Sequence, residues 1–582
     1  MVPQITVLDA GGQYCHLIAR KIRDLGVYAE VRQSETPAVE LQGRKGLIIS
    51  GGPDSVYESG SSRIDPGILS GDAAVLGICY GQQLMAHVLG GFVRKGEKGE
   101  YGIARLHPAR PHPLFSGLNG DSQVWMNHRD AVETPPPGFE VLGSTETCAV
   151  AAIGHSERPL VAVQFHPEVV HTRHGTQILS NFLFRICGCE KDWNPKDRVV
   201  PVENQIRETA AGRSIFFFVS GGVDSTVAYT LCLRALGPER VYGIYVDTGL
   251  MRQGETEYVQ RLFEQLGATA FHVERAEDEF LTALHGVCDP EQKRNIIGEK
   301  FVAVQERVLS SGHFLDGHWI LGQGTIYPDT IESGGTAKAD VIKTHHNRVA
   351  GIQKLIETGR IVEPLSSFYK DEVREIGAEL GIPDEFLHRH PFPGPGLAIR
   401  CLCSETVASV TRRDPGWLLP IRSVGVKGDS RSYHGVLALD SVPAEDIATE
   451  LVNAMPDINR VVGLVRSETD VAEMRSSRGA LTQQRLERLR RADAIVRRLS
   501  GESGFDHQVW QFPVVLIPVG DGRNPDSVVL RPIHSVDGMT AQVVRMPDML
   551  LRRMADELLS VGGVCAVFYD LTHKPPGTIE WE

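Results

Sequence analysis

The sequence is poor in cysteine, has no long apolar run and lacks an excess of positive charge. Ten cysteines in 582 residues are too few for a disulfide scaffold, so a reducing compartment, the cytosol, is the expectation. The pairs Cys187/Cys189 and Cys401/Cys403 have the spacing CxC and lack matched histidines, so we predict no structural metal. No stretch approaches the roughly eighteen apolar residues that span a bilayer. The segment from Met1 is interpreted as a first strand rather than a signal peptide.

The net charge of −13 argues against general affinity for nucleic acid, because such binding relies on neutralising phosphates with Lys and Arg. Residues 474–499 are a local exception, since arginines alternate there with apolar residues at helical spacing. We interpret this segment as a solvated helix face, and an RNA contact is the alternative.

A chain of this length exceeds one hydrophobic core, which predicts two to four domains. Up to about residue 190, short apolar strands alternate with amphipathic stretches, and this pattern predicts an α/β layer fold. The clearest predicted strands are 5–8, 47–49, 74–76 and 161–164. The polar stretch 190–197 is interpreted as a linker. A second α/β unit with a parallel sheet then begins with a strand at 214–219, a helix at 226–236 and a strand at 241–246.

Two later regions have their own patterns. Residues 327–347 are rich in Gly, Asp, Lys and His, which is the profile of a mobile lid. After Ala398 the chain contains an internal repeat, because Gly428-Asp429-Ser430-Arg431 resembles Gly520-Asp521-Gly522-Arg523. We expect a Val-rich strand after each copy, beginning at Val436 and at Val528, and two similar strand-turn-strand subdomains.

The segment Gly77-Ile78-Cys79-Tyr80-Gly81 lies between a predicted strand and a predicted helix. This is the pattern of a nucleophile elbow with Cys in the Ser position, where the helix N-terminus stabilises a thiolate. Gln164-Phe165-His166-Pro167-Glu168 supplies a base and an orienting carboxylate, which predicts a Cys-His-Glu triad. The turn Ser50-Gly51-Gly52-Pro53 is a candidate oxyanion hole. A buried structural cysteine is the alternative interpretation.

In this order and spacing, these residues resemble the class I glutamine amidotransferase domain over approximately residues 1–190. The resemblance implies that Cys79 attacks the glutamine amide, His166 moves the proton and Glu168 orients His166. It further implies two groups of residues around the nucleophile, one supplying oxyanion N–H groups and one holding glutamine. The first group is Gly52 and Tyr80; the second is Gln83, Asn127 and Asp130. His87, His128 and His171 match no catalytic position, and we interpret them as structural or exposed.

A second glycine turn follows the apolar strand at 214–219 and precedes a helix, which predicts a phosphate nest. Its residues are Ser220, Gly221, Gly222, Val223, Asp224, Ser225 and Thr226. It is not a Walker A loop, because GxxxxGK followed by Ser or Thr is absent. It resembles instead the SGGxDS loop of the ATP pyrophosphatase family, which cleaves ATP between its α- and β-phosphates. A structural glycine turn is the alternative.

We expect Mg²⁺ to offset the pyrophosphate charge, with Asp224 as a candidate ligand. Lys370 is a candidate phosphate contact, and a surface helix charge is the alternative interpretation of that lysine.

The segments 324–329, 390–397 and 574–582 resemble those of the GMP synthetase family, and this resemblance covers essentially the whole chain. The family uses ATP to adenylate xanthosine monophosphate (XMP) at the xanthine 2-oxygen and replaces that oxygen with ammonia from glutamine. The resemblance implies XMP contacts from Arg252, Asp429, Gln511, Lys574 and Glu580.

The resemblance also implies an α/β fold with three domains. These are a class I glutamine amidotransferase domain at 1–192, an ATP pyrophosphatase (adenine nucleotide α-hydrolase-like) domain with a parallel sheet at 198–398, and an α+β C-terminal domain with the internal repeat at 399–582. The second copy of the internal repeat, at residues 520–523, identifies a longer subtype of the family. It leaves open whether the protein is a monomer or a homodimer and whether Asp429 or Asp521 contacts XMP.

Three other functions remain open from the sequence. A different amidotransferase would keep both modules and use another acceptor. An RNA-modifying enzyme of the ATP pyrophosphatase family would use the arginine-rich helix for docking. A non-catalytic glutamine or nucleotide sensor would retain the fold without turnover.

Overall fold

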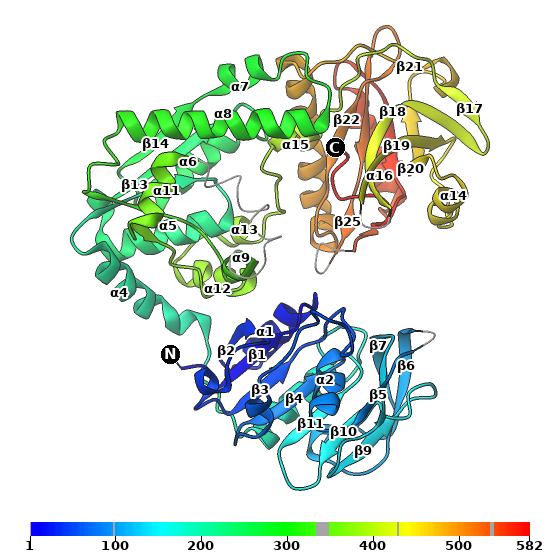
Figure 1. The fold of residues 1–582 in the computed structure, drawn as a ribbon. Coiled ribbons are helices and arrows are strands. Elements are labelled where there is room, and N and C mark those ends of the chain that lie inside the picture. The colour runs from blue at the N-terminus through cyan, green and yellow to red at the C-terminus, as the bar shows by residue number, and fades with distance from the viewer. Residues whose placement is uncertain (1, 97–98, 333–348, 428–429, 536–539) are drawn as a thin grey trace. The chain divides into compact units, whose positions relative to one another are not determined.

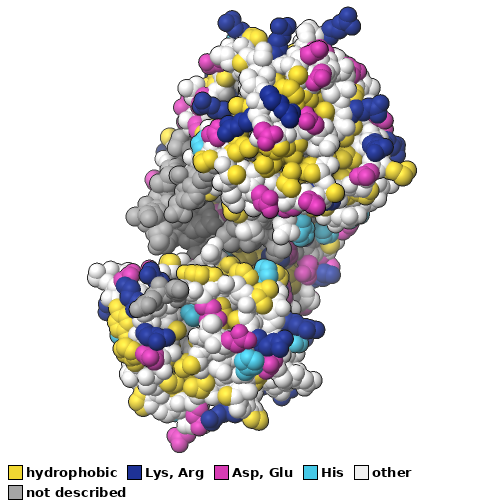
Figure 2. Space-filling view, turned by 90° about the vertical axis from the view of Figure 1, so that its right-hand side faces the viewer, with side chains coloured by type: hydrophobic (Ala, Val, Ile, Leu, Met, Phe, Trp, Pro, Cys, Tyr) yellow, Lys and Arg dark blue, Asp and Glu magenta, His cyan; other side chains and the backbone are white. Residues whose placement is uncertain are grey.

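The computed structural model describes residues 2–96, 99–332, 349–427, 430–535 and 540–582. The chain divides into two compact units (Figure 1). One runs to Arg198 and includes the short helix α9 (Tyr327–Glu332), and the other comprises the remainder. In the described part of the chain, no helix is long and apolar enough to cross a membrane. On the face drawn in Figure 2, basic and acidic side chains are interspersed.

The first unit is built on a nine-stranded sheet of order β2-β1-β3-β4-β11-β10-β9-β6-β7. The first five strands are mutually parallel, and the remaining pairs are antiparallel. The parallel strands are β1 (Ile5–Asp9), β2 (Ala29–Gln33), β3 (Gly46–Ile49), β4 (Ala74–Ile78) and β11 (Leu160–Val163). The others are β6 (Glu100–Pro108), β7 (Ser122–His128), β9 (Phe139–Ser144) and β10 (Ala152–His155). The small pair β5 (Phe92–Arg94) and β8 (Ala131–Thr134) lies outside this sheet.

The helices of this unit are α1 (Cys15–Asp24), α2 (Tyr80–Val88) and α3 (Gly175–Asn181). All four predicted strands are confirmed, with ends shifted by one or two residues. Strand order reverses at β1, which lies between β2 and β3. Ligands of open α/β sheets bind beyond the carboxyl ends of the strands at such a switch point.

The second unit begins with a five-stranded parallel sheet of order β14-β13-β12-β15-β16. Its strands are β12 (Ser214–Val219), β13 (Val241–Asp247), β14 (Phe271–Arg275), β15 (Trp319–Gly322) and β16 (Ile361–Val362). The predicted parallel sheet is therefore confirmed, and β12 lies at the switch point. The predicted helix start at Thr226 is wrong: α5 (Val223–Leu236) begins directly after the glycine turn, with Gly222 as its N-cap.

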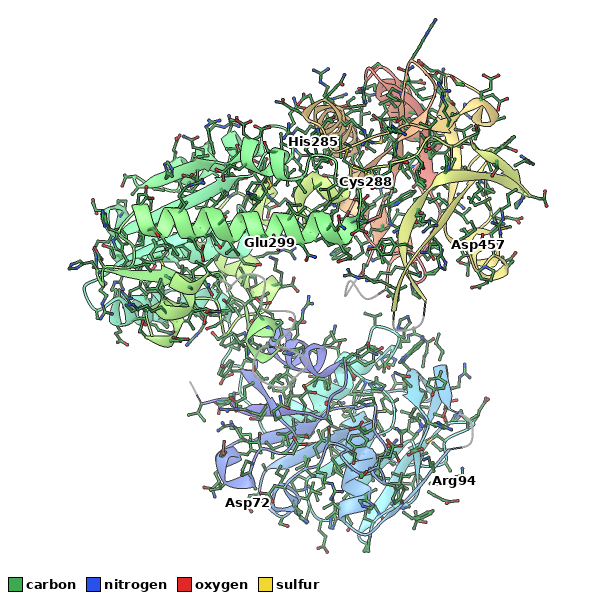
Figure 3. All side chains as sticks on the ribbon, turned by 45° about the horizontal axis from the view of Figure 1, so that its top comes forward. Asp72, Arg94, His285, Cys288, Glu299 and Asp457 are labelled. Atoms are coloured by element: carbon green, nitrogen blue, oxygen red, sulfur yellow. The ribbon has the colours of Figure 1, made fainter. Side chains whose placement is uncertain are left out.

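The other helices around this sheet are α4 (Val199–Ala210), α6 (Glu255–Gln265), α7 (Glu277–Ala283), α8 (Pro290–Ser311), α11 (Ala350–Glu357), α12 (Lys370–Glu379) and α13 (Asp384–Leu387). Figure 3 shows Glu299 on the long helix α8 and Cys288 in the loop before it.

The C-terminal part of this unit contains a seven-stranded mixed sheet of order β17-β18-β19-β20-β27-β24-β22. Its strands are β17 (Thr411–Arg413), β18 (Gly416–Lys427), β19 (Ser430–Leu439), β20 (Ile458–Ser467), β22 (Val514–Ile517), β24 (Asp526–Leu530) and β27 (Val564–Asp570). Smaller pairs join β21 (Arg475–Ser476) to β23 (Val519–Gly520) and β25 (Ile533–His534) to β26 (Gln542–Val543). The helices are α14 (Ala448–Ala454), α15 (Gln483–Ser503) and α16 (Asp548–Leu559).

Both halves of this sheet follow the same course. In each, an antiparallel pair (β18/β19, β22/β24) is followed by a parallel pair (β19/β20, β24/β27). Helix α14 precedes β20, helix α16 precedes β27, and these two strands pair antiparallel at the centre. The Val-rich strands begin at Ser430 and Asp526, so the predicted starts at Val436 and Val528 are wrong. Gly428 and Asp429 lie outside the described residues, as do residues 333–348 of the predicted lid, and the internal repeat stays a prediction.

One hydrophobic core runs through both sheets of the second unit. It contains Phe216 and Leu321 of the five-stranded sheet together with Leu437 and Val567 of the seven-stranded sheet. The predicted boundary near residue 398 therefore separates two sheets that share one core, and the three-domain division stays a prediction.

The arginine-rich helix α15 is only partly the solvated face that the sequence had suggested, because Arg491 and Arg498 are exposed whereas other arginines are buried. Arg485 and Arg488 are buried and form ion pairs with the buried Asp526. Arg490 donates to the backbone carbonyl of Met251 at 3.1 Å. These arginines hold the two sheets together, and their partners are too distant in sequence to be foreseen from helical spacing.

A buried carboxylate anchors the segment around residues 572–581. Asp570 pairs with Arg460 at 2.9 Å and with Arg531 at 2.7 Å, and all three side chains are fully buried. Both guanidinium groups also donate to the carbonyl of Thr578. Burial raises the pKa of Asp570, but Arg531 and Arg460 lower it further, so the net pKa lies below the usual range.

We expect Asp570→Asn to destabilise the second unit by roughly 3–5 kcal/mol, because it leaves two buried guanidinium groups without their charge partner. Since the folded pKa is depressed, this contribution is complete above about pH 4 and is lost as the pH falls through the folded value. Thermal unfolding followed by circular dichroism measures the change. Asp440→Asn, which removes an exposed partner of Arg412, is the control and should leave the midpoint unchanged. Equal midpoints for both variants would contradict this account.

Candidate active sites

Cys79 occupies the sharp turn between β4 and α2. Its backbone has φ 53° and ψ −107°, in a region that non-glycine residues rarely adopt. Its N–H donates to the carbonyl of Val163 in the neighbouring strand at 2.8 Å, which fixes the turn. A Cβ at Gly81 would lie 2.3 Å from the carbonyl oxygen of Ile49, so only glycine fits after the turn. This is the geometry of a nucleophile elbow.

His166 and Glu168 follow β11 and face this turn. Nδ1 of His166 lies 2.7 Å from Oε1 of Glu168, and both side chains are buried. Burial lowers the pKa of His166, but the Glu168 carboxylate and the Cys79 thiol raise it, and the net pKa lies well above the usual value. Nε2 of His166 makes no well-formed hydrogen bond among the described residues. The imidazole therefore has one nitrogen fixed by a carboxylate and one left for proton transfer.

The thiol of Cys79 is oriented by two further groups. It donates to the backbone carbonyl of Asn127 at 3.5 Å and accepts a weak hydrogen bond from Nε2 of Gln164 at 3.6 Å. Tyr80 is the first residue of α2, so its N–H is one of the groups that a helix leaves without an internal partner. Gly52 lies close by, since a Cβ there would be 3.2 Å from the Tyr80 ring.

A cavity of about 540 Å³ opens in front of the thiol. It contains every residue predicted for the glutaminase site except Glu168, which lies behind His166. The cavity is lined by Gly52, Cys79, Tyr80, Gln83, Asn127, Asp130 and His166, among others. Asp130 is held by the Ser55 hydroxyl at 2.6 Å, and its carbonyl accepts from Nε2 of Gln83 at 2.6 Å. The structure thus brings the predicted glutaminase residues together in one pocket.

Sequence reasoning missed part of the lining, including Gly11, Tyr14 and Ser55. The Tyr14 ring packs edge-on against the His166 ring at 5.3 Å. The sequence did contain a signal for these lining residues. Gly11 and Gly12 follow the first strand, and the switch point of the sheet lies at the end of that strand.

The second glycine turn lies between β12 and α5. Gly221 has φ 71°, and the side chains of Ser220 and Ser225 are 3.0 Å apart, with the Ser220 hydroxyl accepting from the N–H of Gly222. A Cβ at Gly324, directly beyond β15, would lie 2.8 Å from the N atom of Ser225. The N-terminus of α5 therefore lies at the switch point of this sheet, the position at which such turns bind anions in other α/β proteins.

Two charged side chains flank this turn. Asp224, in the first turn of α5, forms an ion pair with Lys370, the first residue of α12, at 2.5 Å. Both remain partly exposed, and the pair joins residues 146 positions apart. Val223 and Thr226 are buried and act as packing residues of the helix.

The residues predicted for XMP fall into two groups. Arg252 is buried under the Phe392 ring, and Arg400 lies over the same ring and forms a bidentate pair with Glu580. Lys574 lies elsewhere, in a backbone pairing with Ala541, and Gln511 pairs with Ile533. Asp429 lies outside the described residues. The structure thus brings Arg252 near Glu580, through Phe392 and Arg400.

Models of three families match the chain. The model described as glutamine amidotransferase class-I matches residues 6–186, the one described as NAD synthase matches residues 196–301, and the one described as GMP synthase C terminal domain matches residues 500–581. The first match covers the cavity with Cys79, and the second covers the turn at Ser220.

Several curated proteins resemble the chain over its whole length. A probable glutamine-hydrolyzing GMP synthase of Leptospira interrogans is 42% identical and covers 100% of this chain and 99% of its own. Glutamine-hydrolyzing GMP synthases of Symbiobacterium thermophilum and Caldicellulosiruptor saccharolyticus are 41% and 40% identical, each over 99% of both chains. With this identity over its full length, the chain belongs to the family of glutamine-hydrolysing GMP synthases.

Proposed function

We propose that this protein makes GMP from XMP, ATP and glutamine, releasing AMP, pyrophosphate and glutamate. The observation that carries the proposal is the presence, in one chain, of a buried Cys-His-Glu site and a phosphate-binding turn. In full-length relatives, these two modules belong to proteins named GMP synthases. The reducing cytosol, which keeps Cys79 as a thiol, is the proposed compartment.

In the glutaminase step, the sulfur of Cys79 attacks the side-chain amide carbon of glutamine. His166 takes the thiol proton and returns it to the departing nitrogen, so that ammonia leaves and a thioester remains. The N–H groups of Tyr80 and Gly52 stabilise the negative oxygen of the tetrahedral intermediate. Water then attacks the thioester with His166 as base, which releases glutamate and restores the thiol. Glu168 keeps the imidazole oriented throughout.

In the synthetase step, the xanthine 2-oxygen attacks the α-phosphorus of ATP and pyrophosphate leaves. Ammonia then displaces AMP from the purine carbon and loses a proton, giving GMP. The turn from Ser220 to Ser225 and the N-terminus of α5 bind the phosphates. Asp224 would hold Mg²⁺, which would offset the charge of the pyrophosphate, and a single carboxylate together with phosphates is a ligand set that Mg²⁺ accepts. Lys370 is placed to exchange its contact with Asp224 for a phosphate.

Arg252 supports the placement of an anionic nucleotide. Its side chain is only 9% exposed, its nearest carboxylate is that of Asp493 at 3.5 Å, and its Nε has no hydrogen-bond partner among the described residues. A buried cation with so little compensation is stabilised by an anion. Arg400 lies over the same aromatic ring and pairs with Glu580. For Gln511, Lys574 and Asp429, contact with XMP remains part of the proposal on resemblance alone.

An RNA-modifying enzyme is the second candidate, and the structure does not favour it. Its docking patch would have been helix α15, where Arg485 and Arg488 are buried against Asp526 and fewer arginines, among them Arg491 and Arg498, stay exposed. The oligomeric state, monomer or homodimer, is left to measurement.

Replacing the nucleophile separates the two reactions. We expect Cys79→Ala to lower glutamine-dependent GMP formation by at least about 10³-fold, because covalent catalysis is lost. Synthesis with ammonium chloride should stay within a factor of about two of the wild type, since the second unit is untouched. Cys187→Ala, which removes another thiol of the first unit, is the control for both assays. Retention of glutamine-dependent synthesis in Cys79→Ala would exclude it as nucleophile, and no GMP from either nitrogen source would exclude XMP as acceptor.

Glu168→Gln removes the carboxylate that raises the pKa of His166. The imidazolium loses its charge partner while burial still disfavours it, so its pKa falls. His166 must be neutral to take the thiol proton, so the acidic limb of the pH profile of glutaminase kcat/KM should move to lower pH, and kcat should drop by roughly 10³–10⁴-fold. Steady-state kinetics across pH measures both, with the exposed Glu157→Gln as control. An unshifted acidic limb would show that Glu168 does not act through His166.

Lys370→Met tests the phosphate site. We expect GMP formation from glutamine and from ammonia to fall together by roughly 10²–10³-fold, because a charge aimed at the phosphates is lost. The matched control is Lys354→Met, an exposed lysine of α11, which should behave as the wild type. Pyrophosphate release is the readout. If Lys370→Met keeps full activity, the lysine is only a surface charge.

A further inference from the structure

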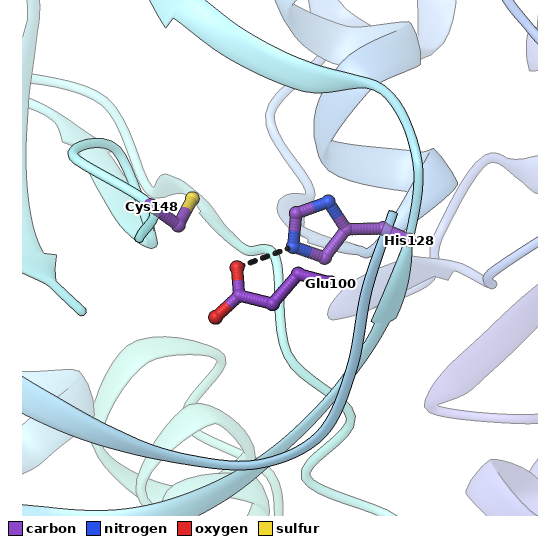
Figure 4. Close-up of side chains that lie close together, drawn as sticks. All are labelled: Glu100, His128 and Cys148. Carbon is purple, nitrogen blue, oxygen red and sulfur yellow. Dashed lines mark hydrogen bonds and ion pairs between the residues drawn. The ribbon is translucent and has the colours of Figure 1, made fainter. Parts of the chain in front are cut away.

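Three side chains with metal-binding atoms converge beside the glutaminase cavity, although the catalytic steps use none of them. Glu100 begins β6, His128 ends β7, and Cys148 lies in the loop before β10. One ligand atom from each lies within 4.8 Å of the other two. Figure 4 shows the Glu100 carboxylate facing the His128 ring, with the Cys148 side chain nearby. In a tetrahedral zinc site, such atoms are about 3.3–3.6 Å apart, so small side-chain rotations suffice.

The hydrogen bonds of His128 prepare one of its nitrogens for a cation. Nδ1 lies 3.1 Å from the carbonyl oxygen of Asp130, which accepts only, so Nδ1 carries the hydrogen. Nε2 lies 3.1 Å from Oε2 of Glu100, which as a carboxylate also accepts only. A neutral imidazole would therefore turn its Nε2 lone pair toward a negative oxygen. This contact is repulsive unless Nε2 carries a second ring proton or shares a cation with the carboxylate.

The other two ligands are also oriented by neighbours. Oε1 of Glu100 accepts from the hydroxyl groups of Thr145 and Thr147. The hydroxyl of Thr145 in turn accepts from the N–H of Cys148 at 2.9 Å. Such outer contacts, together with a histidine whose second nitrogen donates to a carbonyl, are the usual support of a metal centre.

We propose that Glu100, His128 and Cys148 bind a thiophilic divalent cation of the Zn²⁺ class, leaving a fourth position for water. Imidazole, thiolate and carboxylate are the ligands that zinc takes in proteins. Cys148 and His128 are buried, and Glu100 is 19% exposed, so the site is enclosed but not sealed. His128 also lines the glutaminase cavity and lies between Asn127 and Asp130. Cation binding is therefore linked to the loop that carries the proposed glutamine contacts.

The test measures Co²⁺ binding to the full chain, because Co²⁺ reports a thiolate ligand through a charge-transfer absorption band. All proteins carry Cys79→Ala, since Cys79 and His166 would themselves bind a thiophilic metal. The parent should bind one Co²⁺ with a thiolate band and release it to Zn²⁺. Adding Cys148→Ser should abolish the band and weaken binding by roughly 100-fold or more, and Thr145→Val should weaken it about 10-fold.

Two further variants keep the test decisive. Glu100→Gln removes the anionic ligand and preserves the size of the side chain, so it should weaken Co²⁺ binding even if Cys148→Ser misfolds. Cys187→Ser removes a thiol of the CxC pair in the same unit and should leave the band unchanged. Absence of a band in the parent, a band that persists in Cys148→Ser, or a band that disappears with Cys187→Ser would overturn the proposal. The first result would leave His128 and Glu100 as a charged pair that only braces the loop.

Discussion

Close approach of the backbone at the carboxyl ends of parallel strands is the constraint on which both candidate sites depend. A Cβ at Gly52 would lie 2.4 Å from the carbonyl oxygen of Ala10, and one at Gly81 would lie 2.3 Å from that of Ile49. In the second unit, Gly324 is pressed against Ser225 in the same way. Any larger residue would force the turns apart. The glycines therefore hold each turn near its neighbouring strand, and the reactive groups stand at that edge.

The two units use this edge for different chemistry. In the first, α2 begins directly after Cys79, so its positive end favours a thiolate and a developing oxyanion. In the second, α5 begins directly after Gly222, and the turn carries the hydroxyl groups of Ser220 and Ser225 instead of a cysteine. Its N–H groups are free to meet phosphates. A strained cysteine on one turn and an extended glycine on the other thus separate covalent catalysis from nucleotide binding.

Local sequence patterns were sufficient to predict both turns and the parallel strands that lead into them, whereas the predicted starts of the two Val-rich strands were wrong. The strand at 214–219 was predicted with its observed bounds, and the residues around Cys79 and His166 lie in one cavity. The failures involve partners far apart in the chain. Spacing within α15 could not show that Arg485 faces Asp526, and nothing near Lys370 pointed to Asp224. The helix start at Val223 was missed because a glycine N-cap without a side-chain hydrogen bond leaves a weak signal.

The buried arginines of the second unit differ in how closely a carboxylate pairs with them. Arg460 and Arg531 share Asp570, Arg485 and Arg488 share Asp526, and Arg400 has Glu580, each with at least one contact below 3 Å. Such pairs fix the fold, because removing either member would leave an uncompensated buried charge. Arg252 differs, since its nearest carboxylate is 3.5 Å away and an aromatic ring covers it. A buried cation that the protein itself compensates so weakly is suited to an anionic ligand, which supports the proposed nucleotide site at this position.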